Sequence, residues 1–356
     1  MFRSVYDGFE SFLFVSPNSS RNGVHIHDCF DSKRLMTFVI IALLPALLFG
    51  MYNVGLQHYT HINEDFGFMD AFFYGLAAVL PKIVVSYVVG LGIEFTVAQW
   101  KHEEIQEGFL VSGIIIPMII PVTTPLWMLA IAVAFSVIFA KEVFGGTGYN
   151  IFNVALITRA FLFFAYPQTM TGDSVWVSKT IFGTDGITAA TPLADPSSFD
   201  NLNDLVLGFI PGSIGETSVI AIAIGAVILL ATGVASWKTM LSVFVGGIFA
   251  TVLFDNVCDE TNLAAHVEWY KHLCMGGFAF GAVFMATDPV TSARTETGKY
   301  IYGFLVGLIA ISVRVIGGYP EGMMLAILGM NMFAPLIDFF VVDRNIKKRK
   351  NRVNAK

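Results

Sequence analysis

The stretch DGITAATPL at positions 185–193 holds the clearest candidate for chemistry outside the apolar parts of the chain. It offers no metal-ligand cluster, no serine–histidine pair and no phosphate-binding glycine loop. Its reactive group is the hydroxyl of Thr191, which stands between two alanines and a proline. These residue types argue against hydrolytic and phosphate-loop chemistry, and they leave one hydroxyl whose role must be explained.

A second set of candidates consists of charged side chains inside apolar segments, namely Glu94, Arg159, Asp288 and Asp338. A charge at the centre of a bilayer costs at least about 2.5–3.5 kcal/mol, so each one needs a function or a partner. Carboxylate oxygens suit a hard cation such as Na⁺, and an arginine suits an anionic cofactor group. The alternative is buried ion pairing or snorkelling. Asp288 is equally suited to an interfacial cap, and Lys82 is expected to snorkel.

The composition predicts that membrane helices position these residues. Of 356 residues, 55% are hydrophobic and 13% are charged, and the mean hydropathy is +0.68. Soluble domains carry about 25% charged residues. Because every backbone polar group must be satisfied within its own segment in lipid, the apolar runs must be helices, and they are too long for barrel strands. No signal peptide is recognisable, and no nucleic-acid partner is expected.

The three cysteines are scattered and form no CxxC pair, so a self-contained iron–sulfur or zinc site is not expected. The sequence predicts an all-α integral membrane protein with ten spans. They lie at about 36–54, 73–98, 109–121, 126–143, 151–166, 218–236, 239–254, 272–287, 300–316 and 323–341. The third is short and contains Pro117 and Pro121, which indicates either a discontinuous helix that lines a cavity or a kinked helix.

The basic residues predict the orientation. They gather in the arm before the first span and in the tail after the last, so the positive-inside rule places both ends in the cytoplasm. Ten spans, an even number, agree with this. The polar interval 167–217, which has one lysine against six acids, then lies outside the cytoplasm.

Two passages of the sequence are similar to one another at an offset of about 170 residues. GF, SG and PVT at 108–109, 112–113 and 121–123 correspond to GF, GA and PVT at 277–278, 281–282 and 289–291, and FGG at 144–146 corresponds to IGG at 316–318. Five spans in each copy require opposite topologies, and inverted repeats are typical of transporters. We therefore expect a cytoplasmic arm (1–34), two five-helix repeats (35–166 and 218–341), an external linker (167–217) and a basic cytoplasmic tail (342–356).

Longer strings carry a resemblance to a known family. AKEVFGGTG (140–148), RAFLFFAYP (159–167), PGSIGE (211–216) and YPEGMMLAIL (319–328) resemble the B subunits of sodium-translocating NADH:quinone oxidoreductases, and the D subunits of Rnf electron-transport complexes are close relatives. The similarity runs from about position 31 to the tail. It implies a bacterial inner-membrane protein with a fold like that of urea transporters. The polar arm is shorter than the family leads us to expect.

The resemblance gives the hydroxyl a role. The family attaches FMN to a threonine through a phosphoester, in a motif Asp-x-x-Ser/Thr-Gly-Ala-Thr whose last residue is modified. Asp185, Thr188 and Thr191 match this motif, whereas Ala189 stands where the family usually has glycine. Glycine allows a close approach of the backbone, but a methyl group is a small addition. We still expect FMN on Thr191, attached outside the cytoplasm by a flavin transferase.

The resemblance also implies a non-covalent riboflavin, electron transfer to ubiquinone or menaquinone, and a place in a six-subunit complex beside the FMN-carrying C subunit. NADH is oxidised on another subunit. Gly90, Gly92 and Glu94 resemble positions tied to quinone binding, and Glu94, Asp338 and, more weakly, Asp288 resemble acids tied to a Na⁺ path. Two alternatives remain open: the D subunit of an Rnf-type ferredoxin:NAD oxidoreductase, and a channel without redox chemistry.

Overall fold

The structure is a computed structural model that describes residue 23 and residues 32–101, 108–181, 186–195, 201–259, 262–317, 319 and 321–354. It is 71% helical, with a single pair of two-residue strands in the described part. The predicted arm 1–34 lies almost entirely outside the described residues. The all-α prediction is confirmed.

Six helical segments are long and apolar enough to cross a membrane, so the chain is a multi-pass membrane protein. They are α2 (Ser32–Ile62), α3 (Phe68–Lys101), α5 (Leu126–Ser136) continued by the π-helix η1 (Val137–Lys141) and the 3₁₀ turn η2 (Glu142–Phe144), α9 (Trp237–Val257), α12 (Glu296–Ile316) and α13 (Met323–Asn354).

The other predicted spans are shorter or broken helices. Three of them form α4 (Phe109–Met118), α6 (Val154–Ala165) and α8 (Val219–Ala231). The fourth is divided into α10 (Trp269–Cys274), α11 (Phe278–Phe280) and the π-helix η5 (Gly281–Met285), with Gly276 at φ 61° in the break. At a rise of 1.5 Å per residue, the 10 residues of α4 extend about 15 Å, half of a ~30 Å hydrocarbon core.

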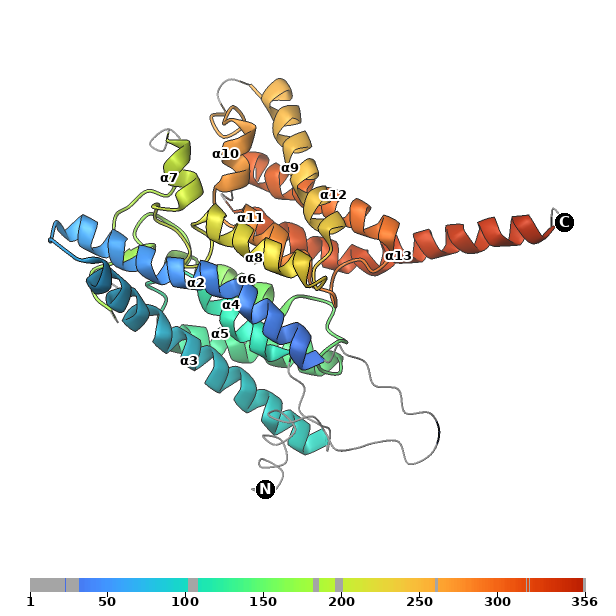
Figure 1. The fold of residues 1–356 in the computed structure, drawn as a ribbon, viewed down its shortest axis with the longest axis horizontal. Coiled ribbons are helices and arrows are strands. Elements are labelled where there is room, and N and C mark those ends of the chain that lie inside the picture. Colours follow the sequence, from blue (N-terminus) through green and yellow to red (C-terminus); the bar gives the residue numbers. More distant parts are fainter. Residues whose placement is uncertain are drawn as a thin grey trace.

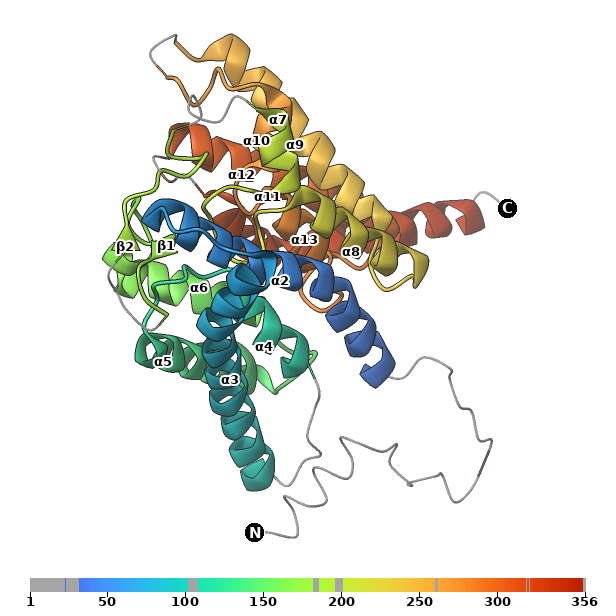
Figure 2. The same ribbon diagram turned by 60° about the vertical axis from the view of Figure 1, so that its left-hand side comes forward.

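The helices of the two predicted halves form two neighbouring groups (Figure 1). In the first, α2 lies along α3, and α4, α5 and α6 pack behind them. In the second, α9 lies along α12, which also packs on α13. The groups meet where α2 contacts α8 and where α6 contacts α13 (Figure 2). The predicted tail from 342 onward does not begin a new element, because α13 continues through it to Asn354 and projects beyond the bundle.

The break after α4 decides between the two alternatives for the third span. The helix ends at Met118, and the following residues, 119–124, are non-helical and buried. Irregular backbone at membrane depth is tolerated only inside the protein, where other groups satisfy it. Here the Gly215 amide donates to the Met118 carbonyl at 2.8 Å, and Lys82 Nζ donates to the Val122 carbonyl at 2.7 Å. The discontinuous helix is confirmed.

The snorkelling expected of Lys82 is wrong. Its side chain is 3% exposed and serves the carbonyls of the broken segment instead of the membrane surface. A break in a helix leaves carbonyl groups without intrahelical donors, and a buried ammonium satisfies one of them.

A glycine on one long helix receives an aromatic ring from the following short helix in each half. A Cβ added at Gly90 of α3 would lie 2.0 Å from Phe109, and one added at Gly247 of α9 would lie 2.6 Å from Phe278. An aromatic residue three positions before each glycine packs on the same ring, with ring centroids 6.4 Å apart for Tyr87–Phe109 and 5.9 Å for Phe244–Phe278. The same close helix–helix packing is thus built twice.

Candidate functional site

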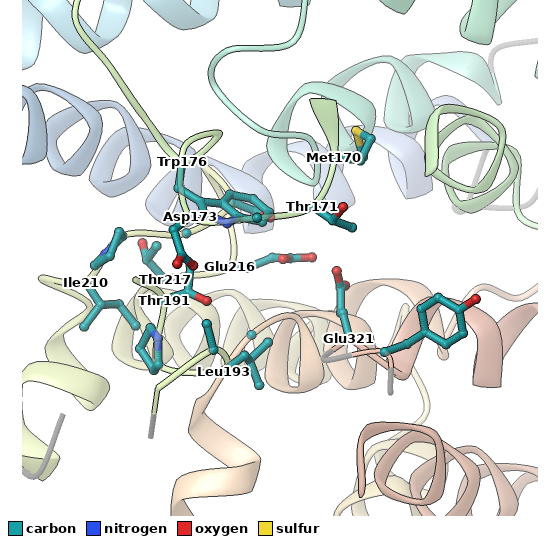
Figure 3. A pocket seen from close by; sticks show the side chains of 18 of the residues that line it. Met170, Thr171, Asp173, Trp176, Thr191, Leu193, Ile210, Glu216, Thr217 and Glu321 are labelled. Atoms are coloured by element: carbon teal, nitrogen blue, oxygen red, sulfur yellow. The ribbon is translucent and has the colours of Figure 1, made fainter. Parts of the chain in front are cut away.

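The 167–217 segment, α6, the break at Gly276 and the residues around the start of α13 enclose a cavity of about 280 Å³ (Figure 3). Thr191 and Arg159 both line it, so the structure brings together two of the predicted cofactor residues. Aromatic side chains form part of its wall, and two carboxylates, those of Glu216 and Glu321, point into the same space (Figure 3). The remaining wall includes Met170, Asp173, Leu193, Ile210, Thr217 and Met324.

Short-range contacts hold Thr191 at this wall. Strand β1 (Val177–Ser178) pairs antiparallel with β2 (Gly186–Ile187), just before the threonine. The Ala189 amide donates to the Asp173 carbonyl at 2.9 Å. The Thr191 carbonyl then accepts the amides of the next turn, and the buried Pro192 follows. The backbone of Thr191 is therefore fixed on both sides.

Helix side chains anchor the external segment to the bundle. His58 Nδ1 lies 2.8 Å from the Ser178 carbonyl, and its ring stacks on Tyr74 with centroids 3.8 Å apart. Asn53 donates to the Ile210 carbonyl at 2.9 Å, and Thr123 donates to the Val175 carbonyl at 2.8 Å. These bonds come from α2 and from the break after α4, so helix packing sets the position of the cavity wall.

The floor of the cavity is a buried ion-pair cluster. Arg159, on α6 and 4% exposed, places Nη1 2.8 Å from Glu216 Oε1, and its Nη2 pairs with Glu321 Oε2. A Cβ added at Gly277 would lie 2.6 Å from Glu216 Oε1 and 2.9 Å from Glu321 Oε1, so the two carboxylates converge above this glycine. The guanidinium that we expected to bind a cofactor anion is thus occupied by two acids of the protein.

The sequence predicts no role for Glu216 or Glu321. Both occur in the stretches that resemble the family, and Glu216 is also one of the six acids of the 167–217 interval. Both stand just outside the apolar spans, where an acid needs no special explanation. Their proximity arises because the segment before α8 and the segment before α13 fold onto α6. The available signal was the pattern Pro-x-x-x-x-Glu and Pro-Glu beside a helix start, which is too weak to select them.

Glu321, which lies outside the membrane-spanning helices, supplies a test by pH. Burial raises the pKa of its carboxyl to about 7, with the charge of Glu216 in the same direction and Arg159 and Arg314 opposing it. Between pH 4.5 and 7 the folded protein therefore keeps a proton that the unfolded chain has lost. The contribution of Glu321 to the free energy of unfolding falls as the pH rises through this range. We expect Glu321→Gln to be more stable than the wild type by roughly 1–3 kcal/mol above pH 7, with no difference below pH 4.5.

Thermal denaturation in detergent across this pH range measures that difference. Glu296→Gln, on an exposed carboxylate of α12, is the control and is not expected to show the same pH profile. A stability difference for Glu321→Gln that is constant with pH would show that the carboxyl titrates normally.

Glu94 forms a second buried ion pair. On α3, Gly90 and Glu94 share the buried face, whereas Gly92 lies on the exposed face with open space around it. The structure therefore separates Gly92 from the other two members of the predicted quinone set. Glu94 Oε1 pairs with Nζ of Lys141, the last residue of η1, and both side chains are at most 5% exposed.

A second cavity, of about 360 Å³, lies between the two halves at the other end of the short helices. Asp288, just after η5, lines it together with Lys141 and with Asn153, the N-cap of α6. Asp288 Oδ2 accepts from Thr291 at 2.9 Å and from Asn153 Nδ2 at 3.4 Å, and Oδ1 accepts from the Val290 amide at 3.1 Å. The carboxylate joins the two halves at this point. It is more than an interfacial cap.

Asp338 occupies a different place. Its carboxylate, on α13, accepts the backbone amides of Arg294 at 2.7 Å and Thr295 at 3.0 Å and the Thr295 hydroxyl at 2.5 Å. These donors precede α12, so Asp338 orders and electrostatically favours the start of that helix. In the part of the chain that the structure describes, no hydrogen bond or ion pair joins Asp338 to Glu94 or Asp288.

The remaining residues of the flavin-attachment motif do not share the surroundings of Thr191. Asp185 lies outside the described residues. Thr188 is exposed, and it does not line the cavity that Thr191 lines. Ala189, the departure from the family pattern, is buried and lines a separate depression with Leu56 and Phe209. Ala189 itself does not line the cavity at Thr191.

Comparison with known proteins shows the family of the chain. Residues 19–347 match the sequence profile described as the NQR2, RnfD, RnfE family. The B subunit of the Na(+)-translocating NADH-quinone reductase from Chromohalobacter salexigens is 41% identical, over 99% of this chain and 92% of its own. The corresponding protein from Neisseria meningitidis serogroup B is 40% identical over 99% and 94%, and that from Pseudomonas paraeruginosa is 41% identical over 98% and 93%.

Both the family match and the relatives span nearly the whole chain, including the external segment with Thr191, the acids around Arg159 and both halves of the bundle. The chain belongs to the NQR2, RnfD, RnfE family.

Proposed function

We propose that the chain is the B subunit of a sodium-translocating NADH:quinone oxidoreductase, embedded in a bacterial inner membrane. The observation that carries this proposal is the convergence of Thr191 with the Arg159 cluster on one cavity, in a chain whose relatives bear that name over nearly their full length. Both termini and the tail of α13 lie in the cytoplasm, and the segment 167–217 lies outside it. The C subunit of the same complex, membrane lipid and a flavin transferase are its partners.

The cavity that Thr191 and Arg159 line, called the outer cavity from here on, suits an FMN esterified to Thr191. Its volume, about 280 Å³, lies just below the range of small-ligand pockets, which run from about 300 to 1,000 Å³, so it would enclose only part of the flavin. Trp176, Phe163 and Tyr319 give it an aromatic wall for a planar ring. Thr191 is only partly buried, so an attaching enzyme has access to its hydroxyl. The methyl of Ala189 lies in another depression and does not narrow this cavity.

The second cavity fits the non-covalent riboflavin. At about 360 Å³ it is mainly apolar, and it offers a small number of polar groups at one end: Asn150, Asn153, Thr147 and Asp288. The buried Thr147 hydroxyl has no hydrogen-bond partner among the described residues. Apolar walls with few polar groups are the usual design of a cofactor site, and two π-helices, a feature frequent at functional sites, end beside it.

The flavins supply electron transfer when they are bound, and the residues of the chain position them and set their surroundings. Around the outer cavity, the positive charge of Arg159 is paired with Glu216 and Glu321, and Asp173 is a third acid, so among the described lining residues the acids outnumber the one cation. In the lining of the second cavity, Lys141 supplies a positive charge and Asp288 a negative one. With the flavins bound, electrons would pass from the outer cavity to the second one and then to the quinone.

We further propose that Glu94, Asp338 and Asp288 serve the Na⁺ path and that Gly90 and Glu94 lie near the quinone. The two halves form an inverted repeat of five segments each, like the fold of urea transporters. The duplicated contacts Gly90–Phe109 and Gly247–Phe278 and the two broken segments at equivalent positions support this repeat.

Mass spectrometry of the purified chain tests the central proposal. We expect one FMN on the proteolytic peptide that contains Thr191, and riboflavin released when the complex is denatured in acid. An unmodified Thr191 peptide in protein expressed with its own flavin transferase would contradict the proposal. NADH:quinone activity of the complex distinguishes it from one built on an Rnf-type D subunit, and flavin content distinguishes the chain from a channel.

Sodium dependence tests Asp338. Because its carboxylate holds the start of α12, we expect Asp338→Asn, whose amide oxygen can keep the two contacts from the Thr295 amide and hydroxyl, to fold with both flavins present. Loss of the negative charge is expected to raise the Na⁺ concentration for half-maximal turnover about tenfold, which corresponds to about 1.4 kcal/mol of binding. Turnover measured against Na⁺ at constant ionic strength checks this. An unchanged Na⁺ dependence would limit Asp338 to its role as a helix cap.

A further inference from the structure

The side chain of Lys141 lies between two functional sites. It is the last residue of η1 and is 3% exposed. Its ammonium group pairs with Glu94 on α3, and Lys141 is also one of the residues that line the second cavity between the two halves. A π-helix inserts an extra residue into a turn and changes the direction of the side chains that follow. The residue is therefore placed to contact both Glu94 and an occupant of the cavity.

Lys141 has two acids in its surroundings: Glu94, with which it forms an ion pair, and Asp288, which lines the same cavity. Among the described residues that line the second cavity, it is the only cation, and Asp288 is the only acid. Glu142, the next residue, is paired with Lys101 at 3.5 Å, and so has its own partner. Glu94 Oε2 is buried and has no hydrogen-bond partner in the part of the chain that the structure describes. Lys141 is thus the sole counter-ion found for Glu94 there.

We infer that Lys141 is a positioning residue that couples negative charge in the second cavity to cation binding at Glu94. The inference rests on the proposed function, which places a flavin in that cavity. If a flavin bound in the second cavity were reduced by one electron, the added negative charge would attract the ammonium of Lys141. Glu94 would lose part of its counter-ion, and one Na⁺ from solution would take its place. One electron and one cation would enter, so the buried charge would stay balanced.

The electrostatics favour this exchange. An uncompensated carboxylate in a low-dielectric interior is costly, and a small cation is the simplest replacement for a withdrawn ammonium group. Linkage makes the effect reciprocal: if reduction increases the affinity for Na⁺, then Na⁺ must raise the reduction potential by the same free energy. Couplings of this kind are typically 5- to 150-fold. For a one-electron step, a tenfold coupling equals about 59 mV.

The reduction potential of the non-covalent flavin tests the inference in the purified whole complex. Spectroelectrochemical titrations are made in saturating Na⁺ and in K⁺ at the same ionic strength, after acid extraction has shown how much riboflavin each preparation holds. We expect at least a fivefold coupling in the wild type, retained in Lys141→Arg and lost in Lys141→Met. Glu94→Gln is also expected to lose it, because the Na⁺ ligand is then absent.

Each result has a definite meaning. A wild-type complex that holds riboflavin but shows no Na⁺-dependent potential overturns the inference, as does Lys141→Met that retains the full dependence. Absence of riboflavin from the wild-type complex would instead contradict the proposed function. If Lys141→Met fails to assemble, Lys141→Arg and Glu94→Gln decide: retention in the first and loss in the second support the coupling, and any other combination rejects it.

Discussion

Thr191→Ala is expected to abolish covalent flavin in this chain completely. The hydroxyl of Thr191 is the only one among the described residues of the DGITAATPL stretch that lines the outer cavity, and alanine removes the oxygen that an ester requires. The backbone at this position is held by carbonyl and amide contacts that alanine preserves. The chain is therefore expected to fold and insert normally. Flavin fluorescence of the denatured protein in a gel measures the loss.

Two matched variants separate attachment from folding. Thr188→Ala removes the other hydroxyl of the stretch, which is exposed and outside the cavity, and is expected to keep most of the fluorescence. Ala189→Gly restores the family pattern and is expected to change the yield less than twofold, because the methyl lies in a separate depression. Full fluorescence in Thr191→Ala would move the attachment site elsewhere.

Arg159→Met is expected to produce the largest loss of stability. Removing one partner of a buried ion pair typically costs about 3–5 kcal/mol, because the remaining charge is buried and uncompensated. Here two carboxylates, Glu216 and Glu321, would lose the same partner. Protonation of Glu321 relieves part of the repulsion, so the cost is expected to be smaller at pH 5–6 than at pH 8. Thermal denaturation of the purified complex at these pH values measures it.

The control for Arg159 is a double variant. Combining Arg159→Met with Glu321→Gln removes one charge of each sign and is expected to recover at least half of the lost stability. Arg159→Lys keeps the charge but reaches only one carboxylate well, because it lacks the planar fork, so an intermediate loss is expected. If the double variant is no more stable than Arg159→Met, the ion pair to Glu321 contributes little.

Hydropathy and charge predicted the helical architecture and the positions of most segments. Membrane-length apolar runs are a local signal, so α2, α3, α9, α12 and α13 each cover a predicted span, although α2 and α13 continue 8 and 13 residues past the predicted ends. The break at Gly276 was not predicted, because composition over 272–287 is as apolar as that of an unbroken span. Whether a glycine ends a helix depends on which groups satisfy the freed carbonyls, and those groups come from distant segments.

The candidate site was predictable only where a motif carried it. Thr191 stands in a recognisable stretch, and the structure places it on a cavity with Arg159. The partners Glu216 and Glu321 and the Lys141–Glu94 pair depend on contacts between residues 47 to 162 positions apart. A single sequence contains no record of such pairs. The prediction for Lys82 was wrong for the same reason, because the Val122 carbonyl that accepts its hydrogen bond is available only where α4 ends early.

The length of α13 gives the molecule a mechanical property. Its 32 residues extend about 48 Å. Met324, in the first turn, lines the outer cavity, whereas the last turns carry a basic stretch beyond the bundle. Asp338 ties the middle of the rod to the start of α12, which gives it a fulcrum. One continuous helix thus joins the cavity that Thr191 lines to the basic stretch, and a tilt about its contact with α12 would move the two ends in opposite directions.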